Sequence, residues 1–149
     1  RTALMTIKNG QEREAPLHDM TCVGIDTCSA RSISCEREDF LHLEITHDLR
    51  ESEVLRGVGG ISGVTGKGVL VFYAKDIDGK VKAIIEPKGV YLADPPAKFR
   101  ILGQQKMKKK GITLIQDYDD EGTDILKCKR SGSVLPLEEG QGILLLKTF

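Results

Sequence analysis

The chain has 149 residues, of which 40% are hydrophobic and 5% aromatic, and this apolar content suffices for the core of one domain. Lysines and arginines together number 22, as do aspartates and glutamates, so the net charge is zero and no global field attracts nucleic acid or an anionic membrane. No apolar run approaches the roughly 20 residues of a membrane span. We therefore expect a single domain over residues 1–149, with neither nucleic acid nor a membrane as a partner.

The first segment predicts an antiparallel start. Residues 3–15 alternate enough to form a β-hairpin, because Asn9 and Gly10 supply the positive φ angles of a type I′ turn. The chain begins with neither an initiator methionine nor a signal peptide, which indicates a fragment cut from a longer protein.

Four cysteines could form two disulfides or a zinc site: Cys22, Cys28, Cys35 and Cys128. No Cys-x-x-Cys pair occurs, and the three histidines are not at ligand spacing from the cysteines. Reduced thiols in a cytosolic protein are the better interpretation, with Cys22 and Cys28 acting as small apolar residues. We expect no metal and no cofactor.

An apolar strand over residues 20–25 leads to a single aspartate, Asp26. A loop of small and polar residues follows it: Thr27, Cys28, Ser29 and Ala30. Most aspartates in such a place cap the loop. If a symmetry-related chain brings a second copy of Asp26 into contact, however, the two carboxylates share one proton and can activate water.

Residues 56–68 hold six of the sixteen glycines. A phosphate-binding loop needs GxxxxGK before Ser or Thr and a helix, and this stretch has neither that spacing nor a following helix. We therefore discount nucleotide binding. The stretch predicts a glycine-rich hairpin tip flanked by strands, which suits either a lid over a cleft or an ordinary flexible hairpin.

The middle of the chain predicts further strands and one helix. Alternation predicts a strand over residues 40–45, and the turn Asp78-Gly79 joins strands 69–77 and 80–86. The remaining expected elements are a strand at 90–92, a break at 94–96, a strand at 99–103 and a helix at 104–110 that ends at Gly111. Four lysines near the helix end indicate a solvated terminus rather than a nucleic-acid site.

The tail predicts more strands. Residues 112–115 form one, and residues 123–129, 133–137 and 143–146 form a three-stranded meander joined by glycine turns. The last strand is apolar enough to serve as an interface between two chains.

The order of these pieces resembles the retropepsins, the homodimeric aspartic proteases of retroviruses and LTR retrotransposons. The similarity spans residues 4–115: the first hairpin at 5–10, the catalytic strand at 23–27, the flap at 57–61 and the apolar strand with glycine at 99–103. Residues 90–111 and the long tail are especially similar to the protease region of copia-type polyproteins.

The resemblance implies an all-β fold: a closed β-barrel with one short helix over about residues 3–115, and an extra C-terminal β-meander over about 116–149. It implies Asp26 as the catalytic aspartate and Thr27 as the residue whose hydroxyl braces the paired loops. The other implied site residues are the active-site loop Cys28, Ser29 and Ala30, the flap residues Val58, Gly59, Gly60 and Ile61, and the supporting strand residues Ile101, Leu102 and Gly103.

Cys28 departs from the family pattern, which has glycine after Asp-Thr. Three explanations are open: the site tolerates the side chain with altered specificity, the domain is a decayed or repurposed pseudoprotease, or the sequence was altered. Ala30 and Arg31 replace an acidic pair common in retroviral members, and Gln104 stands where they often have arginine, so we expect no inter-subunit ion pair there. A cysteine nucleophile would need a histidine held beside it, and nothing in the sequence places one.

The resemblance implies an aspartic endopeptidase that processes its own retroelement polyprotein as a homodimer, with a polypeptide substrate and an activated water. The alternative is a non-catalytic dimerisation or peptide-binding module on the same fold, since a side chain replaces glycine at Cys28. The implied location is the cytoplasm, within virus-like particles of the element.

Overall fold

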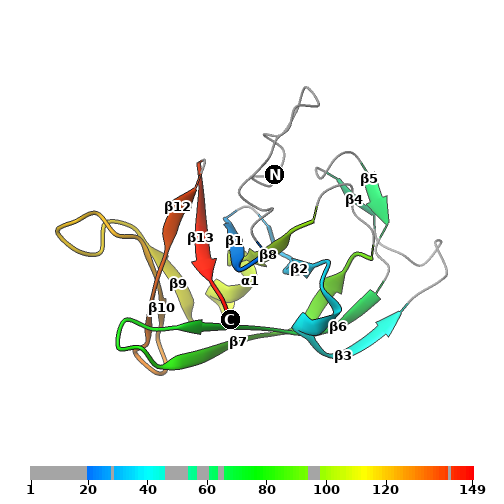
Figure 1. The fold of residues 1–149 in the computed structure, drawn as a ribbon, viewed down its shortest axis with the longest axis horizontal. Coiled ribbons are helices and arrows are strands. Elements are labelled where there is room, and N and C mark those ends of the chain that lie inside the picture. Colours follow the sequence, from blue (N-terminus) through cyan, green and yellow to red (C-terminus); the bar gives the residue numbers. More distant parts are fainter. Residues whose placement is uncertain are drawn as a thin grey trace.

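A computed structural model describes residues 20–27, 29–45, 54–56, 61–63, 66–93, 98–140 and 142–149. The hairpin expected over residues 3–15 lies outside the described residues. The described chain is mostly β-structure with one short α-helix, as the sequence predicts (Figure 1). Within these residues, no helix is both long enough and apolar enough to cross a bilayer.

Eight strands form one mixed sheet. In spatial order they are β12 (Glu138–Gly140), β13 (Ile143–Lys147), β1 (Cys22–Asp26), β8 (Arg100–Gly103), β2 (Ile33–Ser34), β7 (Val81–Tyr91), β6 (Gly66–Lys75) and β3 (Phe40–Ile45). Within the described residues this sheet does not close into the expected barrel, because its edge strands β12 and β3 lie on opposite sides of the molecule (Figure 1). Alternation along the chain predicts strands but not which edges pair, so closure could not be read from the sequence.

Two smaller sheets complete the described β-structure. One has the order β11 (Val134–Pro136), β10 (Ile125–Cys128) and β9 (Ile112–Ile115), and the other pairs β4 (Val54–Arg56) with β5 (Ile61–Gly63). The expected tail meander is therefore wrong in its third member. The strand at 143–147 pairs with β1 and not with β10 or β11, because its Leu145 and Leu146 are buried in the main core.

Local turn signals in the sequence correctly predict the end of the helix and the turn between β6 and β7. The α-helix α1 (Gln104–Lys109) ends near Gly111, whose φ of +85° is the left-handed conformation that glycine adopts without strain. The turn between β6 and β7 contains Gly79 at φ +84°, and Asp76 Oδ1 accepts hydrogen bonds from two backbone amides of this turn. A short 3-10 helix, η3 (Arg37–Asp39), precedes β3.

The strand β7 is longer than expected. The sequence predicts a strand that stops at Glu86 and a separate one at 90–92, whereas β7 runs unbroken to Tyr91. Its pairing with β6 shifts register between Gly68 and Leu70, opposite Pro87. A bulge of this kind tolerates proline within a strand because the ladder is already interrupted there.

The strand β1 lies at the centre of the core. All five of its residues are buried, and its side chains alternate between two apolar clusters. Cys22 packs with Phe99 and Leu145 on one side, while Val23 and Ile25 pack with Leu102 and others on the opposite side. Cys22 is thus a core residue, as its apolar surroundings in the sequence predict. Burial on both faces holds β1 and the aspartate at its end in a fixed position.

Candidate active site

Asp26 is the last residue of β1 and is only 3% exposed, with less than 1 Å² of its Oδ2 atom accessible. On one side β1 runs parallel to β8, which places Asp26 opposite Gly103. On the other side β1 runs antiparallel to β13. The carboxylate therefore stands at the end of a strand whose backbone is paired on both edges (Figure 1).

Gly103 allows the loop after Asp26 to cross the end of β8 at close range. A Cβ atom at this position would lie 2.4 Å from the carbonyl oxygen of Arg31, a distance that forces the backbone apart. The Gly103 amide also donates a 3.0 Å hydrogen bond to Oγ of Ser32, which is fully buried. Its neighbours Ile101 and Leu102 are buried in the core clusters, so the predicted supporting strand lies beside the aspartate.

The loop after Asp26 is held by backbone contacts. The Ser29 amide donates to the Asp26 carbonyl at 3.3 Å, and the Gln105 amide donates to the Ser29 carbonyl at 3.4 Å. Ser29 Oγ accepts a hydrogen bond from the Arg31 amide and donates one to the Arg31 carbonyl. Thr27 and Ala30 are exposed, so the predicted bracing residue faces outward in the single chain. Cys28 lies outside the described residues.

Two short strands flank the residues of the predicted flap. Strands β4 and β5 pair antiparallel with Val54 opposite Gly63 and Arg56 opposite Ile61. Ile61 begins β5. Val58, Gly59 and Gly60 lie outside the described residues.

A groove of about 640 Å³ adjoins the loop but is not lined by Asp26. Its walls come from the loop, β3, β6, β7 and α1, and its lining residues are Ala30, Arg31, His42, Glu44, Lys67, Gly68, Val69, Pro87, Lys88, Val90 and Lys106. Of the predicted site residues that the structure describes, only Ala30 lines it. This groove could not be predicted from the sequence, because its four cations come from one loop and from β6, β7 and α1, and form no local motif.

The described cysteines do not form a nucleophilic site. Burial raises the pKa of the Cys35 thiol and of the Cys128 thiol, which disfavours the reactive thiolate. Cys22 is buried in the core, whereas His42 is exposed on β3. Within the described residues, no group of three or more histidine, cysteine or acidic side chains has the geometry to hold a metal ion.

Neither a protein-family model, nor a curated protein, nor a solved structure matches the chain significantly. Function must therefore be argued from the position of Asp26 and its surroundings.

Proposed function

We propose that the chain is a retropepsin-like aspartic endopeptidase that acts as a homodimer with one Asp26 from each chain. The observation that carries the proposal is the position of Asp26: buried, at the end of a central strand, and opposite Gly103 of a parallel strand that leads into α1. The order of the strand with Asp26, the β4–β5 hairpin, the strand with Gly103 and a short helix also supports it. The closed barrel of that family would then need strands beyond the described residues or from the second chain.

A dimer follows from the chemistry. One carboxylate cannot serve at once as the acid and the base of a water-mediated hydrolysis, but two that share a proton can. A twofold axis near the end of β1 would bring the two copies of Asp26 together. The exposed Thr27 directly after Asp26 supports this arrangement, because its hydroxyl is accessible to a partner chain.

Hydrolysis would proceed without a covalent enzyme species. The ionised carboxylate takes a proton from water as its oxygen attacks the scissile carbonyl, while the protonated carboxyl donates a hydrogen bond to the carbonyl oxygen. The resulting tetrahedral intermediate collapses when the amide nitrogen gains a proton and the C–N bond breaks. The substrate, a segment of the polyprotein, would lie extended beneath the β4–β5 hairpin, where main-chain hydrogen bonds give affinity.

The sequence also predicts that residues 143–146 can serve as an interface strand between two chains. In the single chain β13 is already paired on both edges, with β1 and with β12, and Leu146 is 1% exposed. If the tail joins a dimer sheet, the outer edge of β12 is the available edge. Deleting the tail would uncover β1 as well, so that deletion cannot test dimerisation by itself.

The proposal is tested by following cleavage of a peptide library by mass spectrometry at acidic to neutral pH, with sedimentation to confirm a dimer at the assay concentration. Asp26→Asn keeps the shape of the side chain but removes its acid-base chemistry, so cleavage should disappear while the dimer remains. Asp78→Asn, in the exposed β6–β7 turn, is the matched control and should cleave normally.

Cleavage that survives in Asp26→Asn would overturn the assignment of the catalytic residue. A wild-type dimer that binds peptides but cleaves none would support the non-catalytic module instead.

A further inference from the structure

Cations from two distant segments meet at the end of α1. A pocket of about 340 Å³ is lined by Lys109, Lys110 and Gly111 together with Lys129 and Arg130. The Lys129 amide donates a 2.8 Å hydrogen bond to the Gly111 carbonyl, which fixes the β10–β11 turn against the helix end. Of the described residues, none with an acidic side chain lines this pocket.

The helix connects this pocket to the larger groove. Lys106 lies three and four positions before Lys109 and Lys110, so the three side chains share one side of α1. Lys106 also lines the groove of about 640 Å³, together with the three cations Arg31, Lys67 and Lys88. Eight of the side chains that line the two pockets are cationic. We call them the cationic band: Arg31, Lys67, Lys88, Lys106, Lys109, Lys110, Lys129 and Arg130.

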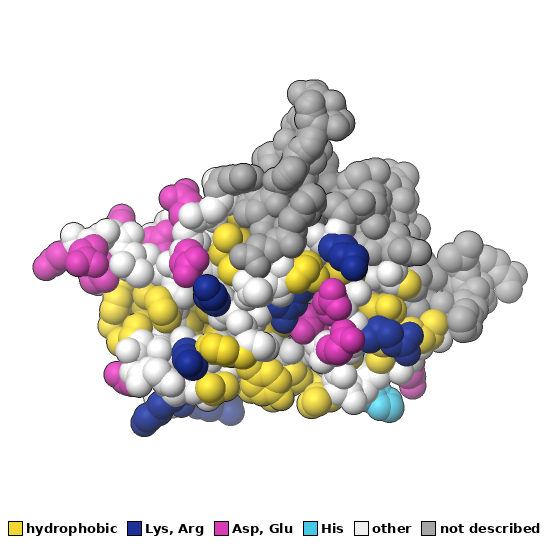
Figure 2. Space-filling model, in the orientation of Figure 1, with side chains coloured by type: hydrophobic (Ala, Val, Ile, Leu, Met, Phe, Trp, Pro, Cys, Tyr) yellow, Lys and Arg dark blue, Asp and Glu magenta, His cyan; other side chains and the backbone are white. Residues whose placement is uncertain are grey.

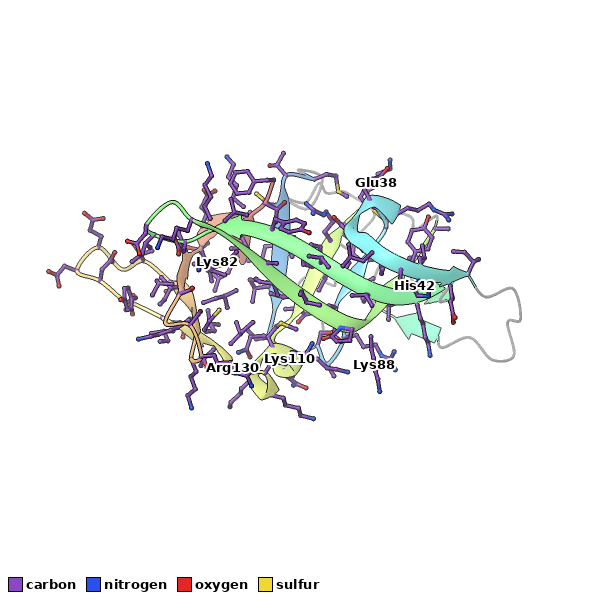
Figure 3. The ribbon with its side chains drawn as sticks, turned by 90° about the horizontal axis from the view of Figure 1, so that it is seen from below. Glu38, His42, Lys82, Lys88, Lys110 and Arg130 are labelled. Carbon is purple, nitrogen blue, oxygen red and sulfur yellow. The ribbon has the colours of Figure 1, made fainter. Side chains whose placement is uncertain are left out.

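Glu86 joins the two halves of the band. Its side chain is 2% exposed; Oε1 accepts from Nζ of Lys110 at 3.2 Å and Oε2 accepts from the Lys88 amide at 2.9 Å. In Figure 3, Arg130, Lys110 and Lys88 follow one another along the lower edge of the view. The ion pair offsets the charge of Lys110, and among the described residues that line the groove Glu44 is the acidic one.

Part of the acidic charge of this neutral chain is gathered in one loop outside the band. Five carboxylates lie in the loop between β9 and β10, at the left tip of Figure 2: Asp117, Asp119, Asp120, Glu121 and Asp124. Stabilisation of the helix end explains cations in the last turn of α1. It does not explain why Lys88, Lys129 and Arg130 are brought to the same band from other elements, where they repel the helix lysines.

We propose that the cationic band binds the phosphodiester backbone of single-stranded nucleic acid. A linear chain with one charge per nucleotide matches cations that line two successive concave pockets, whereas a flat bilayer cannot enter them. None of the large exposed apolar side chains of the described residues lines either pocket, which also disfavours membrane insertion. Because the band has no aromatic side chain to stack on bases and consists mainly of lysines, binding is independent of sequence.

The experiment is fluorescence anisotropy with the full chain and a labelled single strand of about 20 nucleotides, longer than common single-strand site sizes. RNA and DNA strands are compared, because both carry the backbone that the band recognises. Titrations at several salt concentrations give the slope of log affinity against log salt, which is about −0.7 for each phosphate contact.

Lys129→Gln with Arg130→Gln is the test variant, since both side chains are exposed and Glu86 is paired with Lys110. We expect an affinity loss of roughly tenfold near 0.1 M salt and a slope shallower by about 1.4, because two contacts are removed. Lys106→Gln with Lys109→Gln is the second variant, with the same expectation. The matched control is Lys80→Gln with Lys98→Gln, two exposed lysines that line neither pocket, and it should bind as the wild type does.

The proposal fails if the wild type does not bind, or if the control loses as much affinity as the test variants. It also fails if a polyglutamate peptide, or vesicles containing phosphatidylserine, bind more tightly than the oligonucleotides. Asp26→Asn should bind nucleic acid normally, so this result and the cleavage result can fail independently.

Discussion

Arg100 provides a test of what holds the aspartate strand in place. The residue is 6% exposed, and its guanidinium forms a two-pronged ion pair with Asp39, with both N···O distances at 2.8 Å. The remaining nitrogen, Nη1, donates to the Met20 carbonyl at 2.6 Å and to Thr148 Oγ1 at 2.7 Å. One side chain thereby joins η3, the residues before β1 and the end of the chain.

Replacing Arg100 with methionine keeps most of the volume and leaves Asp39 buried without its cation. Breaking a buried pair by removing one partner typically costs 3–5 kcal/mol of unfolding free energy. The Asp39 side chain is 11% exposed and keeps a 2.6 Å hydrogen bond from Ser34 Oγ, so we expect about 3 kcal/mol, at the low end of that range. Lysine at this position supplies charge but not the fork of donors, so Arg100→Lys should recover only part of the loss.

Urea denaturation followed by circular dichroism measures these differences. The control is Arg37→Met, an exposed arginine of η3, which should cost less than about 1 kcal/mol. The double variant Arg100→Met with Asp39→Leu removes both charges, and it should be more stable than Arg100→Met alone because no unpaired carboxylate remains. A loss below about 1 kcal/mol in Arg100→Met, or a double variant less stable than the single one, would refute the reasoning.

Two further predictions concern the loop and the thiols. Gly103→Ala places a methyl group against the Arg31 carbonyl, so thermal denaturation should show a loss of stability of about 1–3 kcal/mol. Any cleavage should also be reduced. An unchanged melting temperature and unchanged cleavage would contradict this contact. Burial raises the pKa of Cys35, so its alkylation by iodoacetamide, followed by peptide mass mapping, should begin at higher pH than that of a free cysteine. Because the pKa of Cys35 is raised, the stability that its neutral thiol contributes is present below the pKa that it has in the unfolded chain. This stability is lost as the pH rises through the pKa in the folded chain, so Cys35→Ser should lose less stability at alkaline pH than the wild type.

Elements with a strong local signal could be predicted from the sequence. The apolar run before Asp26 gives β1, Asp78-Gly79 gives the β6–β7 turn, and Gly111 gives the end of α1. These signals act over a few residues, through burial or through a backbone conformation that glycine adopts most easily. The length of β7 could not be predicted, because Pro87 argues against a continuous strand unless a bulge is already known.

The site could be predicted only in part, because local signals do not show which distant segments of the chain pair. An aspartate at a strand end is visible in the sequence, but its place opposite Gly103 depends on a parallel pairing between segments more than seventy residues apart. The sequence did not predict the cationic band, because the lysines near the end of α1 are explained by the stabilisation of a helix terminus. Only the folded chain brings Lys88, Lys129 and Arg130 to them.

The tail belongs to the scaffold of the site. Its strand β13 pairs with β1 from Cys22 to Ile25, and the following Thr148 amide and hydroxyl both donate to the Thr21 carbonyl. Thr148 also accepts from Arg100, the first residue of β8, whose last residue stands opposite Asp26. The described residues before and after about residue 115 therefore share one core and do not pack as two separate units. A shift of the tail would therefore move both strands that position the aspartate, so any cleavage by the proposed dimer and the stability of the fold should change together when the tail is altered.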